Sequence, residues 1–356
     1  MIESQWVFDD EYPTDILHRH EEKNSLSRLL EPAQHGERAN DILIYGPSGV
    51  GKTATARQML RDLRKRSTVS SALIECSGKT GNGILHEAIE KYPKGTMVHR
   101  NQPREDLVAM LEKIVDGPFI VVLDEADVIP DLDVLEDLLS VDGVSTIAIT
   151  HQHVEWLNRI DRDLRARFHG DSQIEYRKYS TDELVDILEP RVEHGLTGDP
   201  TQDGHLERIA DETGGVARWA IKTVLSAAEL ALERNHDYFH DEDVADAFGR
   251  AKQKIRKDNL RSLPLPHQRL YEIVRVLGPI SGGEMREVYG KQKEAIFEGR
   301  GHDPVSWRQA WNYLSKMADY DLIRMPGDTN AKVYEATDEE LEAPVGFDPG
   351  ETTEVN

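Results

Sequence analysis

The sequence predicts an α/β protein built from three successive parts, and three observations support this division. The first half alternates short apolar runs with helical stretches, as βαβ units do. From about Thr181 the pattern becomes helical. After a proline-containing stretch at Leu263-Pro264-Leu265-Pro266, which is typical of a linker or hinge, three more helices and a short hairpin are expected. The length of 356 residues also exceeds the size at which one hydrophobic core usually stops growing.

The first part, residues 1–170, is expected to form a sheet-containing core. Its candidate strands are β-branched or aliphatic and almost uninterrupted, which indicates burial on both faces and therefore a parallel sheet covered by helices. We expect these strands at Asp41 to Tyr45, Ala72 to Glu75, Phe119 to Leu123 and Ser145 to Thr150.

The second part, residues 171–250, is expected to be a small helical lid. One helix opens at Thr181 with acidic residues in its first turn, and Glu189-Pro190 is expected to disturb it, because proline has no amide proton. Another helix is expected after Gly214-Gly215 and through Ala231.

The third part, residues 251–337, has the element order of a winged helix. Beyond Asp338 the chain is acidic and rich in Pro, Gly and Thr, so residues 338–356 are expected to be disordered. The helices are predicted near His267 to Leu277, Gly283 to Phe297 and Ser306 to Tyr320, and the hairpin strands at Leu322 to Met325 and Lys332 to Ala336.

Charge is distributed unevenly along the chain, whose formal net charge is −23. Residues 250–337 contain 16 Lys and Arg against 11 Asp and Glu, whereas the remainder contains 27 against 55. The third part is therefore the candidate for contacts with nucleic acid. The acidic remainder suits a halophile's salt-rich cytoplasm. A single cysteine, Cys76, and the lack of a long apolar run favour a cytoplasmic protein with no membrane partner.

A phosphate-binding loop is predicted directly after the first strand. The segment matches G-x-x-x-x-G-K-[ST] and precedes a helix expected from Ala54 to Leu63. Backbone N–H groups of such a loop surround phosphates, Lys52 reaches the β- and γ-phosphates of ATP, and Thr53 supplies a hydroxyl to Mg²⁺. The loop consists of Gly46, Pro47, Ser48, Gly49, Val50, Gly51, Lys52 and Thr53.

Two carboxylates end the third expected strand, at the edge of the sheet where ligands bind in α/β proteins. Asp124 fits a role in holding Mg²⁺, together with Thr53. Glu125 is then the candidate to orient and polarise the attacking water.

Taken together, the loop, the Asp-Glu strand end, the lid and the winged helix resemble the archaeal origin-recognition initiators. These AAA+ ATPases are relatives of the eukaryotic origin-recognition and cell-division-cycle loading subunits. The segment Pro13 to Arg19 resembles the one that lies across the adenine in this family, which implies that Ile16 and Leu17 contact the nucleotide base. Asp124 to Asp127 resembles the family's D-E-x-D strand end.

The resemblance implies three further nucleotide contacts. Arg218 matches the lid arginine that reaches the γ-phosphate, and Arg167 resembles the arginine finger given to a neighbouring copy's nucleotide, with Arg165 as the alternative. Where the family often has Asn at the end of the sensor strand, this chain has His151, so slow or altered hydrolysis is expected. For the triplet His151-Gln152-His153 we expect no zinc site, because histidines at alternate positions on an extended segment, without Cys or acidic partners, are weak evidence for one.

The helix expected from Ser306 is the candidate DNA reader. Its apolar stripe is predicted to be buried, and its opposite face carries residue types that hydrogen-bond base edges and phosphates. A solvated face or a protein-docking surface is the alternative. The stripe is Trp307, Trp311, Leu314 and Met317, and the candidate DNA contacts are Arg308, Asn312, Ser315 and Lys316, with Arg324 and Lys332 flanking the wing.

The hypothesis favoured by the resemblance is an initiator that uses ATP binding and slow hydrolysis to switch DNA binding at origins. Its expected partners are double-stranded DNA, other copies of the initiator and a replicative helicase, with a monomer in solution or assembly that depends on ATP or DNA. Two alternatives stay open, a non-hydrolysing ATP-gated regulator or scaffold, and an ATPase of the transposition or clamp-loading type.

Overall fold

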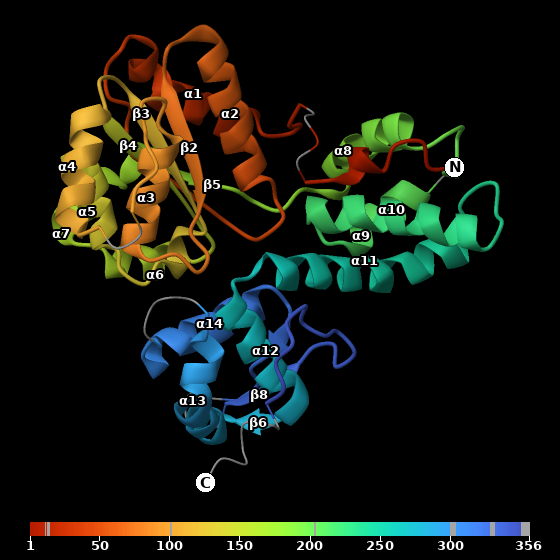
Figure 1. Ribbon diagram of the computed structural model, residues 1–356. Coiled ribbons are helices and arrows are strands. Elements are labelled where there is room, and N and C mark those ends of the chain that lie inside the picture. Colours follow the sequence, from red (N-terminus) through yellow and green to blue (C-terminus); the bar gives the residue numbers. More distant parts are fainter. Residues whose placement is uncertain are drawn as a thin grey trace. The chain divides into compact units, whose positions relative to one another are not determined.

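The computed structural model describes residues 1–10, 12, 15–99, 102–202, 204–299, 304–327 and 332–349. The chain divides into two compact units, Met1–Ala251 and Lys252–Asn356, each described by itself below (Figure 1). No helix in these described ranges is long and apolar enough to cross a membrane.

A five-stranded parallel sheet forms the centre of the first unit, with the strand order β2-β3-β4-β1-β5. Four strands agree with those predicted to within two residues. The fifth, β5, was not predicted, because a strand of three residues with one buried side chain carries too little pattern. The strands are β1 (Ile42–Tyr45), β2 (Ser70–Glu75), β3 (Phe119–Asp124), β4 (Val144–Thr150) and β5 (Gln173–Glu175).

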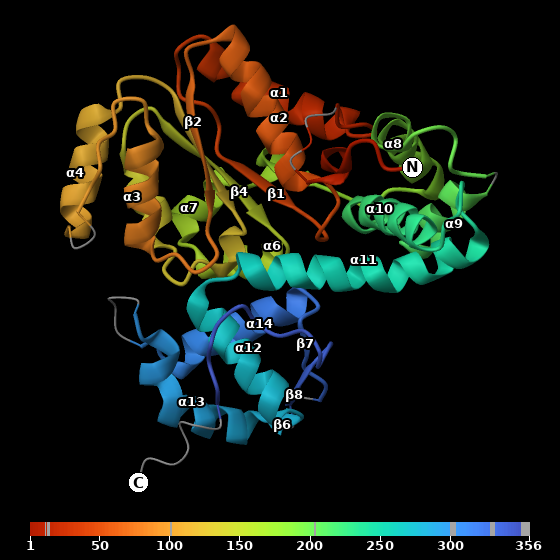
Figure 2. The same cartoon turned by 45° about the vertical axis from the view of Figure 1, so that its right-hand side comes forward.

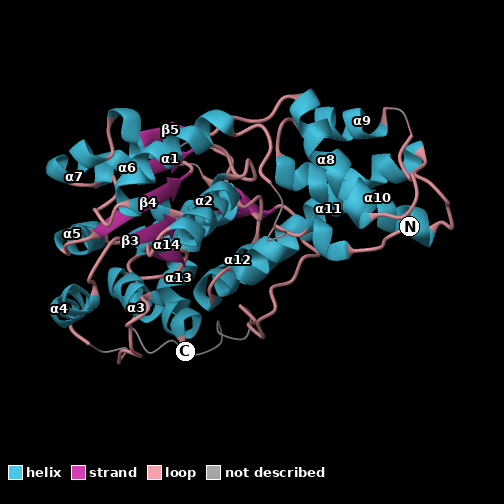
Figure 3. Ribbon diagram, turned by 90° about the horizontal axis from the view of Figure 1, so that it is seen from above, coloured by secondary structure: helices cyan, strands magenta, loops and turns pink. Residues whose placement is uncertain are grey.

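Helices cover both faces of this sheet, as the apolar strands require (Figures 2 and 3). Alternate residues of each strand enter separate cores. Ile42 and Ile44 pack with α1 (His20–Gln34) and α2 (Lys52–Arg66), whereas Leu43 belongs to the core on the other face. That second core includes residues of α3 (Gly81–Lys91), α4 (Arg104–Ile114), α5 (Asp133–Ser140), α6 (His153–Arg159) and α7 (Arg162–Arg167), and short 3₁₀ turns lie at Ala126–Val128 and Gly170–Ser172.

The lid is a separate helical cluster within the first unit. Its first helix continues through Pro190, so the expected disturbance there is wrong. A capping box between Ser180 and Glu183 begins that helix, and buried Leu184 and Leu188 hold it against its neighbours, which offsets the missing amide proton. The helices are α8 (Thr181–Gly195), α9 (His205–Glu212), α10 (Ala217–Glu233) and α11 (Asp241–Ser262), of which α11 crosses the boundary between the units.

The first residues of the chain pack with the lid, although the sequence assigns them to the sheet domain. Val7 and Phe8 of the 3₁₀ helix η1 (Gln5–Phe8) are buried in the lid core. Ile2 forms an isolated β-bridge with Leu196. The N-terminal segment therefore belongs to the lid by its contacts.

The second unit contains the three predicted helices and the hairpin, together with a short additional strand. The strand order is β6-β8-β7, with both pairs antiparallel. The elements are α12 (Leu265–Leu277), β6 (Ile280–Ser281), α13 (Gly282–Phe297), α14 (Trp307–Asp319), β7 (Ile323–Arg324) and β8 (Val333–Ala336).

The expected linker at residues 263–266 is instead part of the second unit. Leu263 is 3% exposed and lies in that unit's core, and Pro264 caps α12, which begins at Leu265. Proline suits this position, because the first amides of a helix have no partner within the helix.

The tail was predicted to be disordered, and for residues 338–349 this is wrong. The Tyr271 hydroxyl donates to the carbonyl oxygens of Asp338 and Leu341 at 3.1 and 2.8 Å, and the Ala343 N–H donates to Glu272 at 2.7 Å. Leu341, Val345 and Phe347 pack against the core. Composition misled the prediction, because a few apolar residues anchor this acidic segment. Residues 350–356 lie outside the described chain.

Candidate functional site

The loop between β1 and α2 lies at the carboxyl end of the sheet and depends on glycine. Gly46, Gly49 and Gly51 have φ of 141°, 74° and 91°, a region that favours glycine. A Cβ atom on Gly46 would lie 2.2 Å from the Tyr176 carbonyl oxygen, and one on Gly49 would lie 2.8 Å from Cγ1 of Val216. This backbone, followed directly by a helix N-terminus, has the form of a phosphate-binding loop.

Lys52, the first residue of α2, is a buried cation with 6% exposure. Its Nζ donates to the carbonyl oxygens of Gly46 and Pro47, each at 2.7 Å, and lies 3.3 Å from Nδ1 of His151. Burial lowers the pKa of Lys52 to about 8, although the Asp124 carboxylate opposes this shift. A bound phosphate would compensate this charge more strongly than carbonyl dipoles do.

Oxygen ligands suited to Mg²⁺ meet beside the loop. The Thr53 hydroxyl donates to Oδ1 of Asp124 at 3.0 Å, so groups from α2 and from the end of β3 are adjacent. Glu125 follows in the left-handed region with φ of 57°, and its N–H donates to the same Asp124 oxygen at 3.1 Å. A hydroxyl and a carboxylate are hard donors, so Thr53 and Asp124 fit the predicted metal role.

The two histidines after β4 contact different neighbours. His151, at the predicted sensor position, lies next to Lys52, which places it at the phosphate loop. His153 stacks on Tyr45 with ring centroids 3.9 Å apart. The triplet therefore divides its imidazoles between the loop and the end of β1.

The first turn of α10 brings the lid onto the phosphate loop. The backbone N–H of Arg218 donates to the Gly49 carbonyl oxygen at 3.1 Å. The Arg218 guanidinium pairs with Asp10, with Nε 2.9 Å from Oδ2. The predicted lid arginine is thus at the loop, and a carboxylate of the N-terminal segment contacts it.

The segment expected to cover the adenine is attached to α2 and α1. The Ile16 N–H donates to Oε1 of Gln58 at 3.3 Å, and its carbonyl oxygen accepts from Nζ of Lys23 at 2.9 Å. Ile16 and Leu17 are half-buried. Pro13 and Thr14 of the same motif lie outside the described residues.

Arg19 is a residue of this region that the sequence analysis missed. It is 4% exposed, and its guanidinium donates to the carbonyl oxygens of Val50 in the phosphate loop and Arg177 at 3.1 and 2.6 Å. The guanidinium also lies 3.8 Å from the centroid of the Tyr179 ring. Arg19 thereby joins the segment before α1 to the loop. No local pattern reveals this, because its partners are carbonyl groups distant in sequence.

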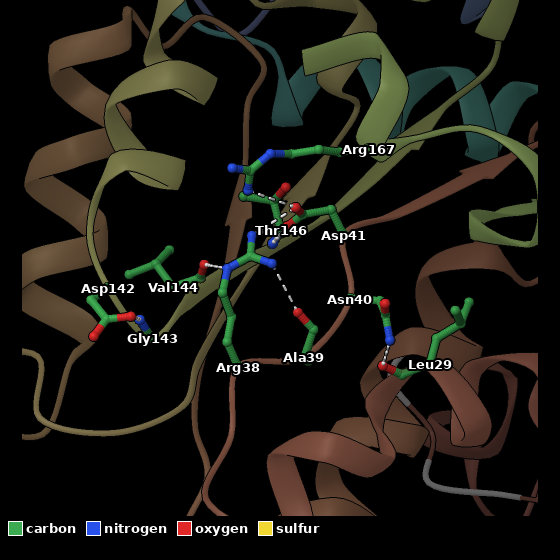
Figure 4. A network of polar contacts seen from close by, with 10 residues as sticks. All are labelled: Leu29, Arg38, Ala39, Asn40, Asp41, Asp142, Gly143, Val144, Thr146 and Arg167. Carbon is green, nitrogen blue, oxygen red and sulfur yellow. Dashed lines mark hydrogen bonds and ion pairs between the residues drawn. The ribbon is translucent and has the colours of Figure 1, made fainter. Parts of the chain in front are cut away.

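Arg167, at the end of α7, lies at the opposite end of the sheet. Its NH1 is 3.3 Å from Oδ2 of Asp41, just before β1. The Asp41 side chain is 2% exposed and also accepts from Arg38 at 2.6 and 2.7 Å and from the Thr146 N–H at 2.9 Å (Figure 4). Because the phosphate loop follows the other end of β1, Arg167 is separated from it by roughly the length of that strand, about 13 Å.

A cavity of about 530 Å³ opens beside this network. Arg165, the alternative candidate for the arginine finger, instead donates from its guanidinium to the Ile160 carbonyl oxygen at 3.4 Å. The cavity is lined by Arg38, Asn40, Asp41, Leu139, Ser140, Val141, Asp142 and Arg167.

Comparison with known proteins identifies the family. Residues 35–155 match the model of an AAA domain, and residues 185–249 match that of a Cdc6 AAA+ ATPase-type lid domain. ORC1-type DNA replication protein 9 of Halobacterium salinarum is 31% identical over 331 residues, covering 92% of this chain and 91% of that protein. This chain belongs to the ORC1-type DNA replication proteins.

Solved structures agree with the fold. The Aeropyrum pernix ORC1 protein, solved in complex with DNA, covers 94% of this chain and 92% of its own with a TM-score of 0.67 at 24% identity. The Aeropyrum pernix ORC2 protein, solved as ADPNP-ADP complexes, covers 96% and 95% with a TM-score of 0.60 at 21% identity. The parallel core and lid predicted from the sequence are confirmed, and the ORC1-type chain is an AAA+ ATPase. The comparisons do not favour a scaffold or a transposition-type ATPase. The Halobacterium relative agrees with the acidic, halophilic composition.

The second candidate site of the ORC1-type chain, on α14, differs from its prediction. Arg308 is exposed and Asn312 is half-buried, as a contact face requires. Lys316 is 2% exposed, with its ammonium 4.2 Å from the centroid of the Tyr320 ring, and the Ser315 hydroxyl oxygen is covered. The prediction that Ser315 and Lys316 contact DNA from the outer face is therefore wrong, because both side chains lie against the unit's own residues.

The aromatic stripe of α14 is only partly buried. Leu314 and Met317 lie in the core, whereas Trp311 is 37% exposed, which corrects its predicted burial. Nζ of Lys332 lies 4.9 Å from the centroid of the Trp311 ring. Arg324 is exposed, and its NH1 is 4.0 Å from Glu335.

Proposed function

We propose that this ORC1-type protein is a replication initiator whose binding to double-stranded DNA at origins is switched by ATP. The backbone contact of Arg218 with Gly49 carries the proposal, because it couples the position of the lid to the loop that would surround the phosphates and places the Arg218 side chain beside that loop. The names of the relatives, and the Aeropyrum ORC1 protein solved with DNA, support DNA as the partner.

Each nucleotide-site residue has a role that follows from its position. Lys52 exchanges carbonyl partners for the β- and γ-phosphates, and Thr53 and Asp124 would hold Mg²⁺, which shields phosphate charge. Glu125 orients the attacking water, and His151 contacts the γ-phosphate in place of an amide. An imidazole next to the Lys52 ammonium is a poorer donor arrangement than an amide, so slow hydrolysis is expected.

Arg167 is proposed to act on the nucleotide of a neighbouring copy. Its position at the amino end of β1 separates it from its own loop, while 44% exposure of the side chain leaves it accessible. The protein would thus be a monomer in solution that assembles with ATP or DNA, and the assembly would recruit the replicative helicase.

The C-terminal unit is proposed to be the winged helix that contacts DNA. Arg308 and Asn312 are one turn apart on α14 and address neighbouring base edges. Arg324 and Lys332, on either side of the hairpin turn, contact backbone phosphates.

The experiment is fluorescence anisotropy of an origin-region duplex in molar KCl with ATP, ADP or no nucleotide. We expect ATP and ADP to give different DNA affinities in wild type, and Arg218→Ala to remove the difference. Arg208→Ala is the matched control, since this lid arginine pairs with Glu212 and should leave the difference unchanged. Equal DNA affinity with ATP and ADP in wild type, under conditions where both nucleotides bind, would contradict the switch.

A further inference from the structure

The turn between α10 and α11 gathers two histidines and a glutamate away from the nucleotide loop. His236, His240 and Glu242 each offer one ligand atom, and these atoms lie within 4.8 Å of one another. We propose that they bind a divalent cation of the Zn²⁺ class, which ties the end of α10 to the start of α11. The site is independent of the ATP switch.

His236 is held in place by both its backbone and its ring. Its N–H donates to the Ala231 carbonyl oxygen at 2.8 Å, after Asn235 turns the chain with φ of 59°. Nδ1 lies 2.8 Å from Oδ2 of Asp243, whose side chain has 0% exposure. Because an ionised carboxylate only accepts hydrogen bonds, Nδ1 is the donor in this contact, and a ring whose only N–H is on Nδ1 has its lone pair on Nε2. A carboxylate in this place orients metal-binding imidazoles.

The same buried carboxylate positions the second ligand. The His240 N–H donates to Oδ2 of Asp243 at 2.9 Å. The His240 ring stacks on that of His236, with centroids 3.7 Å apart and planes 8° apart. Glu242, in the first turn of α11, has Oε1 3.8 Å from Nε2 of His236 and a side chain that is 65% exposed. His236 and His240 are thus both held by the carboxylate of Asp243.

The ligand atoms have to approach one another before a cation is bound. Ligands at 2.0–2.1 Å from a tetrahedral zinc ion are roughly 3.3 Å apart, so spacings of up to 4.8 Å have to close by at most about 1.5 Å. On binding, the His240 ring moves out of its stack with His236, and the exposed Glu242 side chain rotates toward the ion. The His236 ring keeps its position. Arg234 also pairs with Asp243, but through Oδ1 at 2.9 Å, which leaves the His236 contact on Oδ2 intact.

The donor set determines the class of ion. Two neutral imidazoles and a carboxylate suit Zn²⁺ and its transition-metal neighbours, whereas Mg²⁺ and Ca²⁺ prefer oxygen ligands throughout. Three protein ligands leave a fourth position for water. The expected effect is a tighter connection between two lid helices.

The test is calorimetric titration of the full-length protein with ZnCl₂, in buffer without nucleotide or Mg²⁺. We expect one Zn²⁺ per chain, and affinity reduced by about tenfold or more in both His240→Gln and Glu242→Gln. His35→Gln, an exposed histidine of α1's C-cap, and Asp124→Asn, which alters the other divalent-ion site, should keep the wild-type affinity.

Thermal unfolding gives a second readout, because an ion that binds only the folded chain raises Tm. At a Zn²⁺ concentration of 100 times the Kd, we expect the Tm of the first unit to rise by about 5 °C. MgCl₂ should change the Tm of wild type and the Tm of His240→Gln by the same amount. No binding of Zn²⁺ by wild type, or equal binding by wild type and both site variants, would overturn the proposal. Neither result bears on ATP binding.

Discussion

The phosphate loop and the face of α14 were both predicted from short stretches of sequence, and they differ in how their side chains lie. At the loop, Nζ of Lys52 lies 3.3 Å from Nδ1 of His151, and the Thr53 hydroxyl donates to Asp124 at 3.0 Å. On α14, Lys316 is buried and Trp311 is exposed, the reverse of the prediction.

The difference arises from what creates each site. A phosphate loop is made by consecutive residues and by its own backbone, so a motif largely specifies its geometry. A helix face is defined by the elements that pack around it, and spacing alone does not identify the side chains that those elements cover. Substitutions in the loop should therefore strongly reduce ATP binding or hydrolysis. Substitutions on α14 should instead distinguish side chains that contact DNA from side chains that pack in the unit's core.

The largest effect is expected for Glu125→Gln. Loss of the carboxylate that orients water should reduce the rate of ATP hydrolysis by about 100-fold or more, with ATP affinity retained. Phosphate release measures the rate, and calorimetry measures the affinity. A variant that hydrolyses ATP at the wild-type rate would remove Glu125 from the chemistry.

Lys52→Ala should weaken ATP binding by roughly 100-fold, because two charge-assisted hydrogen bonds to phosphate are lost. Lys65→Ala is the matched control, since this lysine of the same helix is exposed and pairs with Asp62. Calorimetry should find its affinity unchanged. Tight binding by Lys52→Ala would show that the loop is not the phosphate site.

The pH dependence of ATP binding sharpens this further. Lys52 has its pKa lowered to about 8, so it is cationic below that pH and becomes neutral above it. Phosphate binding favours the cation, so affinity should fall about tenfold between pH 7 and pH 9. The same titration with Lys52→Ala should lose this step, and a step of equal size in the variant would assign it to another group.

On α14 the double variant Arg308→Ala/Asn312→Ala should lower specific binding of an origin-region duplex by about tenfold, with a smaller loss for a scrambled duplex. Lys316→Ala should instead lower Tm and leave the DNA affinity of the folded protein unchanged, because the side chain is buried. Anisotropy and thermal unfolding distinguish the two. Unchanged binding by the double variant would favour a protein-docking role for this face.

The smallest effect is expected for Lys332→Ala. Removal of one phosphate contact should weaken all duplexes similarly and reduce the salt slope by about one unit in a KCl series. The Lys332 ammonium also lies near Trp311, so tryptophan fluorescence reports any local change. A sequence-dependent loss would identify Lys332 as a base contact instead.

Local pattern alone predicted the parallel strands β1 to β4, the glycine-rich loop, two of the lid helices, α8 and α10, and the order of elements in the second unit. Each depends on period, turn residues or a consecutive motif, all of which are local. The closeness of Thr53 and Asp124 was also predictable, because strand ends and loops of a parallel sheet meet at one edge.

Only the tertiary structure placed the residues whose partners are distant in sequence. Arg19 is buried against carbonyl oxygens of Val50 and Arg177, and Asp41 holds Arg167 across 126 positions. Lys316 and the tail near Ala343 are covered by neighbouring elements despite their polar surroundings in sequence. Burial and charge pairing of this kind depend on which segments pack together, and no local period or composition encodes that choice.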